Sequence, residues 1–333
     1  MRSRGLDVHL ITSPGAYLQQ FALEEGATAH AVPMERRITP LRDIVSLFRI
    51  WTTLRRVKPD IVHASTPKGG LLGTIAARLA GVPVVIYHIR GLASTGGGWV
   101  QRTLLKATER IAATLAHRVL CVSNSVRDES VAEGIVPWEK TVVLRSGSSN
   151  GVAAATRYNP SNVAPGTREA IRKQLGIPQD AVVTGFVGRL VRDKGIIELA
   201  DAWESVAQQH PNAWLLIVGP WEPRDPVPPA TRKKLESALR IAFAGEQEDM
   251  APFYSAMDLV VLPTYREGFP NVPLEAAAMN LPSVVSDATG CVDAVVNGVT
   301  GTVVPVRNSG ALARAIEAYL ADGALRNKHG EAG

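Results

Sequence analysis

The chain has 333 residues, of which 46% are hydrophobic and 20% are charged, so it can bury two cores in domains of roughly 150 residues and is not a disordered polymer. Its two cysteines, Cys121 and Cys291, lie far apart, which argues against a disulfide framework and suits a reducing cytosol. No apolar run reaches the roughly 18 residues that span a bilayer, and we expect a soluble, cytoplasmic protein.

Charge is divided unevenly along the chain. Residues 1–165 carry 20 basic and 11 acidic side chains, a balance of +9, whereas residues 166–333 carry 16 and 20, a balance of −4. A basic half indicates an anionic partner. We find no basic strand with interleaved aromatic residues and no zinc finger, so we expect no nucleic acid. An anionic membrane surface or a lipid pyrophosphate is the partner that we predict for the first half.

Short β-branched runs alternate with amphipathic stretches throughout. In the first half, the runs that predict strands are residues 8–12, 60–63, 83–88, 118–122 and 141–144. In the second half they are residues 181–187, 214–218, 241–243, 258–262, 283–286 and 301–304. Strands that alternate with helical stretches, such as 41–57 and 194–210, predict an α/β fold built from βαβ units with parallel sheets.

The rhythm breaks at residues 146–166, which read SGSSNGVAAATRYNPSNVAPG. This composition, with little apolar periodicity, predicts a linker between domains. We therefore predict a first domain at 1–150, a linker at 151–166 and a second domain at 167–333.

The predicted helix at 41–57 carries two sets of side chains. A stripe with the spacing of a core-facing surface consists of Leu41, Ile44, Val45, Phe48 and Trp51. A basic row that recurs every seven residues consists of Arg42, Arg49 and Arg56. This row is either a solvated face or a patch that rests on anionic lipid, where each basic residue contributes about 1 kcal/mol.

Two carboxylates separated by seven residues, Glu267 and Glu275, stand in the run EGFPNVPLE. The run follows the predicted strand 258–262 and leads into a helical stretch. Glu267 is therefore expected on a loop at the carboxyl end of a strand, where α/β sheets bind ligands. The amides of residues 271–274 are expected at the positive end of the helix, which attracts phosphate, with Asn271 as the helix cap.

A second signal is the run FVGRLVRDKG at residues 186–195. An apolar strand leads into Gly188, and Arg189 and Lys194 then flank a short turn before a helix. Two cations at such a turn suit a diphosphate, because arginine offers a bidentate fork and lysine a mobile point charge. Basic residues near turns are common, so this signal becomes strong only together with the carboxylate pair.

GRLVRDKG followed by EGFPNVPLE resembles the retaining family-4 glycosyltransferases, whose hallmark is the E-x7-E spacing. The resemblance extends over most of the chain and is greatest to bacterial transferases that build capsule, O-antigen or other polyprenyl-linked glycans. It implies two Rossmann-like domains whose parallel sheets face a cleft, the GT-B fold. It also implies transfer of a hexose or N-acetylhexosamine from a UDP-sugar, with retention, to a glycan or polyprenyl-pyrophosphate-linked acceptor. A peripheral position at the inner face of the membrane is part of the same expectation.

The same resemblance implies roles for the donor-side residues. Arg189 and Lys194 hold the diphosphate and stabilise its charge as it leaves. Glu267 takes hydroxyls of the sugar, and Glu275 accepts hydrogen bonds from the ribose. The other donor-binding residues are Gly188, Gly245, Glu246, Gly268, Phe269, Asn271, Val272 and Leu274. One preorganised donor at a leaving group is commonly worth around 3 kcal/mol. No metal and no other cofactor is expected, and no Asp-x-Asp motif occurs in the chain.

Acceptor-side candidates lie in the first half. Lys68 follows the predicted strand 60–63 and precedes two glycines, so it is either a ligand of the acceptor's pyrophosphate or a surface lysine. Many family members carry a histidine at the strand end that YHIRG occupies in this chain. The best alignment places Arg90 at that position and His88 two residues earlier, and we take Lys68, His88 and Arg90 as the acceptor candidates.

The resemblance also concerns the ends of the chain. The family's first strand and its glycine-rich loop would come before residue 1, and the last helix would continue past residue 333. We therefore expect a first domain that lacks its first strand, which is central in the family's sheet.

Two other functions stay open. One is a nucleotide-sugar epimerase on the same fold, and the other is a truncated protein that binds sugar nucleotides without turnover. A glycosidase needs two carboxyl groups that face each other across one bond, which this arrangement does not require. A dehydrogenase is disfavoured because no strand is followed by G-x-G-x-x-G.

Overall fold

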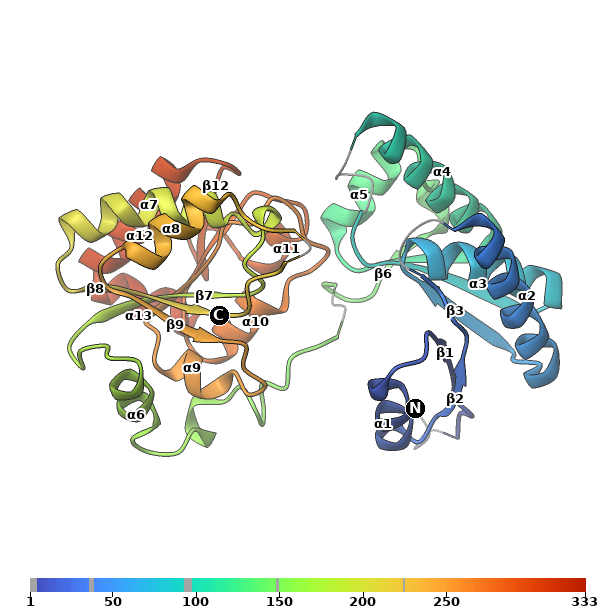
Figure 1. Cartoon of the computed structure of the whole chain (residues 1–333), viewed down its shortest axis with the longest axis horizontal. Coiled ribbons are helices and arrows are strands. Elements are labelled where there is room, and N and C mark those ends of the chain that lie inside the picture. Colours follow the sequence, from blue (N-terminus) through green and yellow to red (C-terminus); the bar gives the residue numbers. More distant parts are fainter. Residues whose placement is uncertain (1–4, 36–38, 93–97, 148–149, 224) are drawn as a thin grey trace. The chain divides into compact units, whose positions relative to one another are not determined.

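The computed structural model describes residues 5–35, 39–92, 98–147, 150–223 and 225–333. The chain forms two compact units, one of Met1–Val122 with Val126–Arg145 and one of Ser123–Ser125 with Ser146–Gly333. Each unit is a Rossmann-like α/β domain with parallel strands and helices packed on them, which confirms the predicted fold class (Figure 1). Residues 146–166, which contain the 3-10 helix η4 (Pro160–Asn162), belong to the second unit.

The second unit is built on a six-stranded parallel sheet with the order β12-β11-β10-β7-β8-β9. Its strands are β7 (Val182–Val187), β8 (Ala213–Val218), β9 (Ile241–Gly245), β10 (Leu259–Leu262), β11 (Ser283–Ser286) and β12 (Gly301–Val304). They correspond to the six runs predicted in this half. The central strands are continuous apolar runs, AWLLIV in β8 and LVVL in β10, because helices cover both of their faces.

Helices cover the two faces of this sheet in separate sets. One face carries α7 (Ile196–Gln209), α8 (Pro229–Ser237) and α12 (Ser309–Ala321), with Trp203 and Ile316 fully buried. The other face carries α6 (Thr167–Gln174), α9 (Ala251–Ser255) and α10 (Asn271–Ala278), with Tyr254 fully buried. The remaining elements are the 3-10 helix η5 (Arg192–Lys194), α11 (Cys291–Ala294) and α13 (Gly323–Glu331).

The first unit contains two separate parallel sheets within its described residues. One pairs β1 (His9–Thr12) with β2 (Thr28–Ala31), and the other has the order β3 (Ile61–Ser65), β4 (Val84–Ile89), β5 (Arg118–Cys121) and β6 (Thr141–Val143). The accompanying helices are α1 (Ala16–Glu25), α2 (Pro40–Val57), α3 (Pro67–Ala80), α4 (Trp99–Leu115), α5 (Asn124–Ala132) and η3 (Trp138–Lys140). Strand β2 was not predicted, because TAHA contains no apolar or β-branched run; its pairing with β1 stabilises it.

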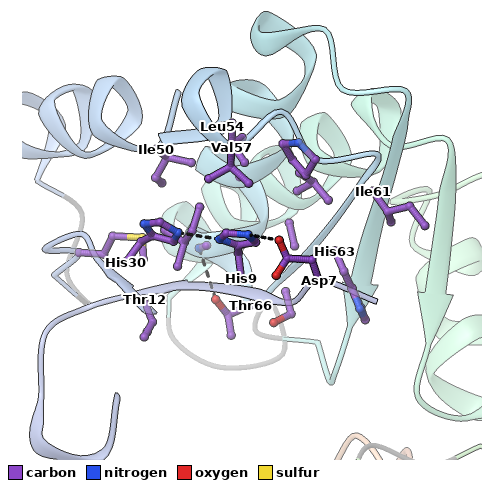
Figure 2. A pocket seen from close by; sticks show the side chains of 18 residues that line it. Asp7, His9, Thr12, His30, Ile50, Leu54, Val57, Ile61, His63 and Thr66 are labelled. Atoms are coloured by element: carbon purple, nitrogen blue, oxygen red, sulfur yellow. Dashed lines mark hydrogen bonds and ion pairs between the residues drawn. The ribbon is translucent and has the colours of Figure 1, made fainter. Parts of the chain in front are cut away.

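A hollow of about 390 Å³ lies between β1 and β3, with α2 on one side (Figure 2). The amide of Val84 bonds the carbonyl of Asp60, and alternate residues of a strand turn their backbone groups to opposite sides. The backbone N–H and C=O of His63 therefore point away from β4. The amide of Thr28 likewise bonds the carbonyl of Val8, so the backbone N–H and C=O of His9 point away from β2. Two strand edges therefore border this hollow.

The prediction for the core stripe of α2 was wrong. Four of its five residues are exposed: Leu41 (82%), Ile44 (63%), Val45 (50%) and Phe48 (60%). The residues that pack into the core are Ile50 and Leu54, with Leu47 and Trp51 partly buried beside them. Helix α2 has apolar residues on two sides, and helical periodicity alone does not say which side meets the neighbouring helix α3. Among the described helices, none is long and apolar enough to cross a bilayer.

Candidate functional site

The two sequence signals lie on neighbouring strands of the second sheet. From β7 the chain proceeds outward through β8 and β9, then returns to place β10 on the other side of β7. The strand order reverses between β7 and β10, and ligands of open α/β sheets bind beside the carboxyl ends of strands at such a point. The loop after β7 carries Arg189 and Lys194, and the loop after β10 carries Glu267.

Hydrogen bonds fasten these two loops together. The carbonyl of Asp193 accepts from the amide of Tyr265 at 2.8 Å and from the hydroxyl of Thr264 at 2.9 Å. Gly195 ends the η5 turn with φ of +72°, and a Cβ at this position would lie 1.9 Å from the carbonyl oxygen of Pro263. Only glycine permits that approach. The position of Lys194 is therefore set by backbone contacts on both sides.

Lys194 forms an ion pair with Glu267. Both side chains are largely shielded, with 22% of the lysine and 16% of the glutamate side chain exposed. The amide of Glu267 bonds the carbonyl of Thr289 at 3.1 Å, which fixes the loop from its other side. The structure thus joins a cation from the first signal to a carboxylate from the second, at the edge of the sheet where a ligand is expected.

Arg189 does not share this contact. Its guanidinium lies 3.6 Å from Glu222, on the loop after β8, and 58% of its side chain is exposed. The two cations predicted to act together therefore face different carboxylates in the structure. Contact between Arg189 and the diphosphate of a bound nucleotide stays a prediction.

Glycines end three adjacent strands on the same side of the site. Gly188 follows β7, Gly219 follows β8, and Gly245 is the last residue of β9. A Cβ on Gly219 would lie 2.0 Å from the carbonyl oxygen of Gly188, and the Gly219 amide bonds the carbonyl of Gly245 at 2.7 Å. Sequence reasoning missed Gly219, although the repeated pattern of an apolar strand followed by glycine (FVG, IVG, FAG) was a usable signal. Glu246 is exposed directly after these glycines.

Helix α10 begins at Asn271, so the prediction that Asn271 caps the helix was wrong by one residue. The cap position is Pro270, which has no side-chain hydrogen bond to offer, and the first turn holds no acidic residue. The amide oxygen of Asn271 is buried and has no partner in the described structure. Phe269 is buried. Gly290 approaches Gly268 so closely that a Cβ on Gly290 would lie 2.4 Å from the carbonyl oxygen of Gly268.

Along the same helix lie Val272 and Leu274, both partly buried, and then Glu275. The hydroxyl of Tyr254 donates to the carboxylate of Glu275 at 2.8 Å. Sequence reasoning missed this tyrosine because it lies on another helix, α9, about 20 residues earlier, and no motif marks it.

The acceptor candidates fall into two groups in the first unit. Lys68 forms an ion pair with Asp43 at 2.8 Å, and less than a fifth of either side chain is exposed, so its charge is already matched by a carboxylate of α2. His88 stacks on His63, with ring centroids 5.1 Å apart, and Arg90 follows at the end of β4. The structure thus places His88 near Arg90, whose charge acts on it, and adds His63 to the group.

Acid is expected to destabilise the first unit through His88. Burial, together with the charges of His63 and Arg90, lowers the pKa of His88 to about 4. The unfolded histidine titrates near 6.5. Because the folded pKa is depressed, the neutral His88 side chain contributes to the free energy of unfolding. This contribution is complete above pH 6.5 and is lost as pH falls toward 4. The melting temperature of the wild type should fall more between pH 7.5 and pH 5 than that of His88→Gln. His210→Gln, in the second unit, is the control, and an equal fall in all three proteins contradicts the prediction.

Comparison with known proteins places both halves of the chain. Residues 167–333 match the family described as Glycosyl transferases group 1, and residues 1–147 match the Glycosyl transferase 4-like domain. The chain is 33% identical to the capsular polysaccharide biosynthesis glycosyltransferase CapM of Staphylococcus aureus, over all of its 333 residues and 85% of that relative. It is 31% identical over 289 residues to the UDP-Gal:alpha-D-GlcNAc-diphosphoundecaprenol alpha-1,3-galactosyltransferase of Escherichia coli, which covers 85% of this chain and 72% of the relative.

Solved structures agree on the fold. The crystal structure of Anabaena Alr3699/HepE in complex with UDP-glucose superposes with a TM-score of 0.80 at 22% identity, over 97% of this chain and 85% of that chain. Its architecture is the GT-B fold that the sequence predicted. With both halves matched and a relative 33% identical over the whole of this chain, the chain belongs to the group 1 glycosyltransferases, with a glycosyl transferase 4-like domain in its first half.

Proposed function

We propose that this glycosyltransferase moves a hexose or an N-acetylhexosamine from a UDP-sugar, with retention, to a glycan or polyprenyl-pyrophosphate-linked acceptor in surface polysaccharide synthesis. The observation that carries the proposal is the Lys194–Glu267 pair beside the uncapped start of α10, at the reversal of strand order. The relatives support the substrate class, since one is named for capsule synthesis and another for a diphosphoundecaprenol-linked acceptor.

The chemistry follows from where charge develops. The bond between the anomeric carbon and the diphosphate oxygen breaks, a bond to the acceptor oxygen forms, and the acceptor's proton leaves with the departing UDP. Lys194, Arg189 and the first amides of α10 stabilise the negative charge on the phosphate oxygens. Glu267 accepts hydrogen bonds from sugar hydroxyls, and Glu275 from the ribose. We propose that these groups act without a metal ion, so turnover should survive a chelator.

Two glutamate variants test the donor site. Glu275→Ala should abolish the thermal stabilisation that UDP or a UDP-sugar confers, because the ribose contact is lost. Glu267→Ala should keep UDP binding but lower turnover about 100-fold, since its hydrogen bonds act on the reacting sugar. The measurement is a thermal-shift series with UDP-, GDP- and ADP-sugars, followed by turnover on a polyprenyl-pyrophosphate glycan.

The matched control is Glu236→Ala, an exposed glutamate of the same unit that pairs only with Arg232 among the interactions described. It should leave both binding and turnover unchanged. If Glu267→Ala and Glu275→Ala also behave as the wild type, the assigned site is wrong. If only GDP-sugars stabilise the protein, the donor is a GDP-sugar and the assignment of the site stands.

We also propose that the first unit rests on an anionic membrane surface through α2. The exposed side of this helix carries Leu41, Ile44, Val45 and Phe48, which we name the α2 apolar face. The basic row of Arg42, Arg49 and Arg56 runs along its border, and all three arginines are exposed. A helix with exposed apolar residues and basic flanks suits the boundary between lipid head groups and acyl chains.

Vesicle binding tests this surface without reference to catalysis. The wild type should bind vesicles that contain phosphatidylglycerol and should bind poorly to pure phosphatidylcholine, because the arginines require anionic lipid. Ile44→Ser combined with Phe48→Ser should reduce binding at least tenfold, since burying each side chain stabilises by about 1.5–3 kcal/mol. Leu239→Ser, which alters an exposed leucine of the second unit, is the control. Equal binding by the double variant and the control would show that α2 is not the contact.

A further inference from the structure

The segment that joins the predicted domains contributes side chains to the second unit. Tyr158 is only 8% exposed and packs edge-on against Tyr254, with ring centroids 6.0 Å apart. Its neighbour Arg157 lies over the Tyr158 ring and bonds Asp249 at 3.1 Å. Arg157 also donates to the carbonyl of Glu248. Residues 157 and 158 are therefore held in place against α9 and the loop after β9.

Both tyrosines act on the same carboxylate. The hydroxyl of Tyr254 donates to Oε2 of Glu275 at 2.8 Å, and Tyr158 lies close enough to Glu275 for the carboxylate to act on its hydroxyl. Burial and the charge of Glu275 together raise the pKa of Tyr158 to about 12. Burial and Glu275 likewise raise the pKa of Tyr254 well above its usual value. Both phenols stay protonated at neutral pH and so remain hydrogen-bond donors toward the carboxylate.

We propose that Tyr254 and Tyr158 are positioning residues that hold the Glu275 carboxylate in one orientation for the ribose of the nucleotide. The Tyr254 hydroxyl engages Oε2 and leaves Oε1 for the ribose hydroxyls, and Tyr158 packs against the Tyr254 ring and supports its position. A carboxylate ordered before binding loses less freedom when the nucleotide arrives, so the affinity is higher. This inference rests on the ribose-binding role proposed for Glu275.

Discrimination between UDP and 2′-deoxy-UDP measures this role. The wild type should prefer UDP, because Glu275 accepts from the ribose hydroxyls. Tyr254→Phe should weaken UDP binding about fivefold, as expected when a hydrogen bond that orients a binding group is lost, and leave 2′-deoxy-UDP binding almost unchanged. Adding Tyr158→Phe should lower the preference further. Both dissociation constants are measured by calorimetry, and the melting temperature of each variant is recorded.

The matched control is Tyr319→Phe. Tyr319 is fully buried in the same unit, and its hydroxyl contacts Thr302 and His329 rather than Glu275. It should lower the melting temperature and leave the nucleotide preference intact, which separates a structural effect from a positioning effect. If Tyr254→Phe does not fold, Tyr158→Phe alone carries the same test.

The outcomes separate the two proposals. If Glu275→Ala removes the preference for UDP and the tyrosine variants keep it, the positioning role is overturned and the ribose contact stands. If Glu275→Ala also keeps the preference, or the wild type has none, the ribose contact itself falls and the positioning role falls with it. A preference that declines in the order wild type, single variant, double variant and Glu275→Ala supports both.

Discussion

Lys194→Ala is expected to lower kcat by about two to three orders of magnitude while the nucleotide still binds. Lys194 is the cation that the structure places beside Glu267, on a turn bonded to the loop that follows β10. A preorganised donor at a leaving group is worth about 2.7–4 kcal/mol in the transition state, and alanine offers no replacement. The measurement is single-turnover transfer from a UDP-sugar, compared with UDP affinity.

A second variant separates chemistry from stability in this experiment. Lys194→Ala leaves the shielded carboxylate of Glu267 without its cation, so the melting temperature should also fall. Lys194→Ala combined with Glu267→Ala removes both charges and should recover most of that loss without recovering turnover. Lys233→Ala, which alters an exposed lysine of α8, is the control for charge alone. If the double variant recovers activity together with stability, the lysine supports the fold and has no role in the transfer.

Arg172→Leu is expected to destabilise the second unit by about 3–5 kcal/mol, because it removes one partner of a buried ion pair and leaves buried carbonyls without a donor. The Arg172 side chain is fully buried and donates to the carbonyls of Gln179, Ala181 and Ala256 at 2.8–3.1 Å. It also bonds the carboxylate of Asp258 at 2.9 Å. Leucine would leave these four acceptors without that donor, so the melting temperature should fall by roughly 10 °C.

The neighbouring arginine supplies the comparison. Arg168 also bonds Asp258, at 2.7 Å, but 36% of its side chain is exposed, so water can replace it in Arg168→Leu. Calorimetry should show a clearly smaller loss for Arg168→Leu than for Arg172→Leu. Equal losses would mean that burial of the guanidinium does not decide the effect.

Much of the local structure could be read from the sequence. All six strands of the second sheet coincide with predicted runs, because strands covered on both faces need continuous apolar residues. Strand β2 escaped detection because its four residues, TAHA, contain none of the usual strand formers except one threonine. Its stability comes from pairing with β1, a strand elsewhere in the sequence, so the four residues of β2 carry no local signature.

The site was predictable in part for the same reason. Glu267, Lys194 and Gly188 each follow a recognisable strand, so their location at the carboxyl edge of a sheet follows from the pattern. Their grouping depends on β7 lying beside β10, which is a matter of strand order. Sequence reasoning paired Arg189 with Lys194, but the fold turns Arg189 to Glu222, on a loop that the sequence did not connect to it.

The sequence by itself determined where this protein has most of its strands, which turns carry charge, and which family motif its second half contains. These properties are local, since they depend on side-chain periodicity and on residues a few positions apart. The tertiary structure alone decided that Lys194 meets Glu267, that Tyr254 bonds Glu275, and that Leu41, Ile44, Val45 and Phe48 of α2 face outward. Each of these depends on which elements become neighbours, and a helix with apolar residues on two sides cannot specify its own partner.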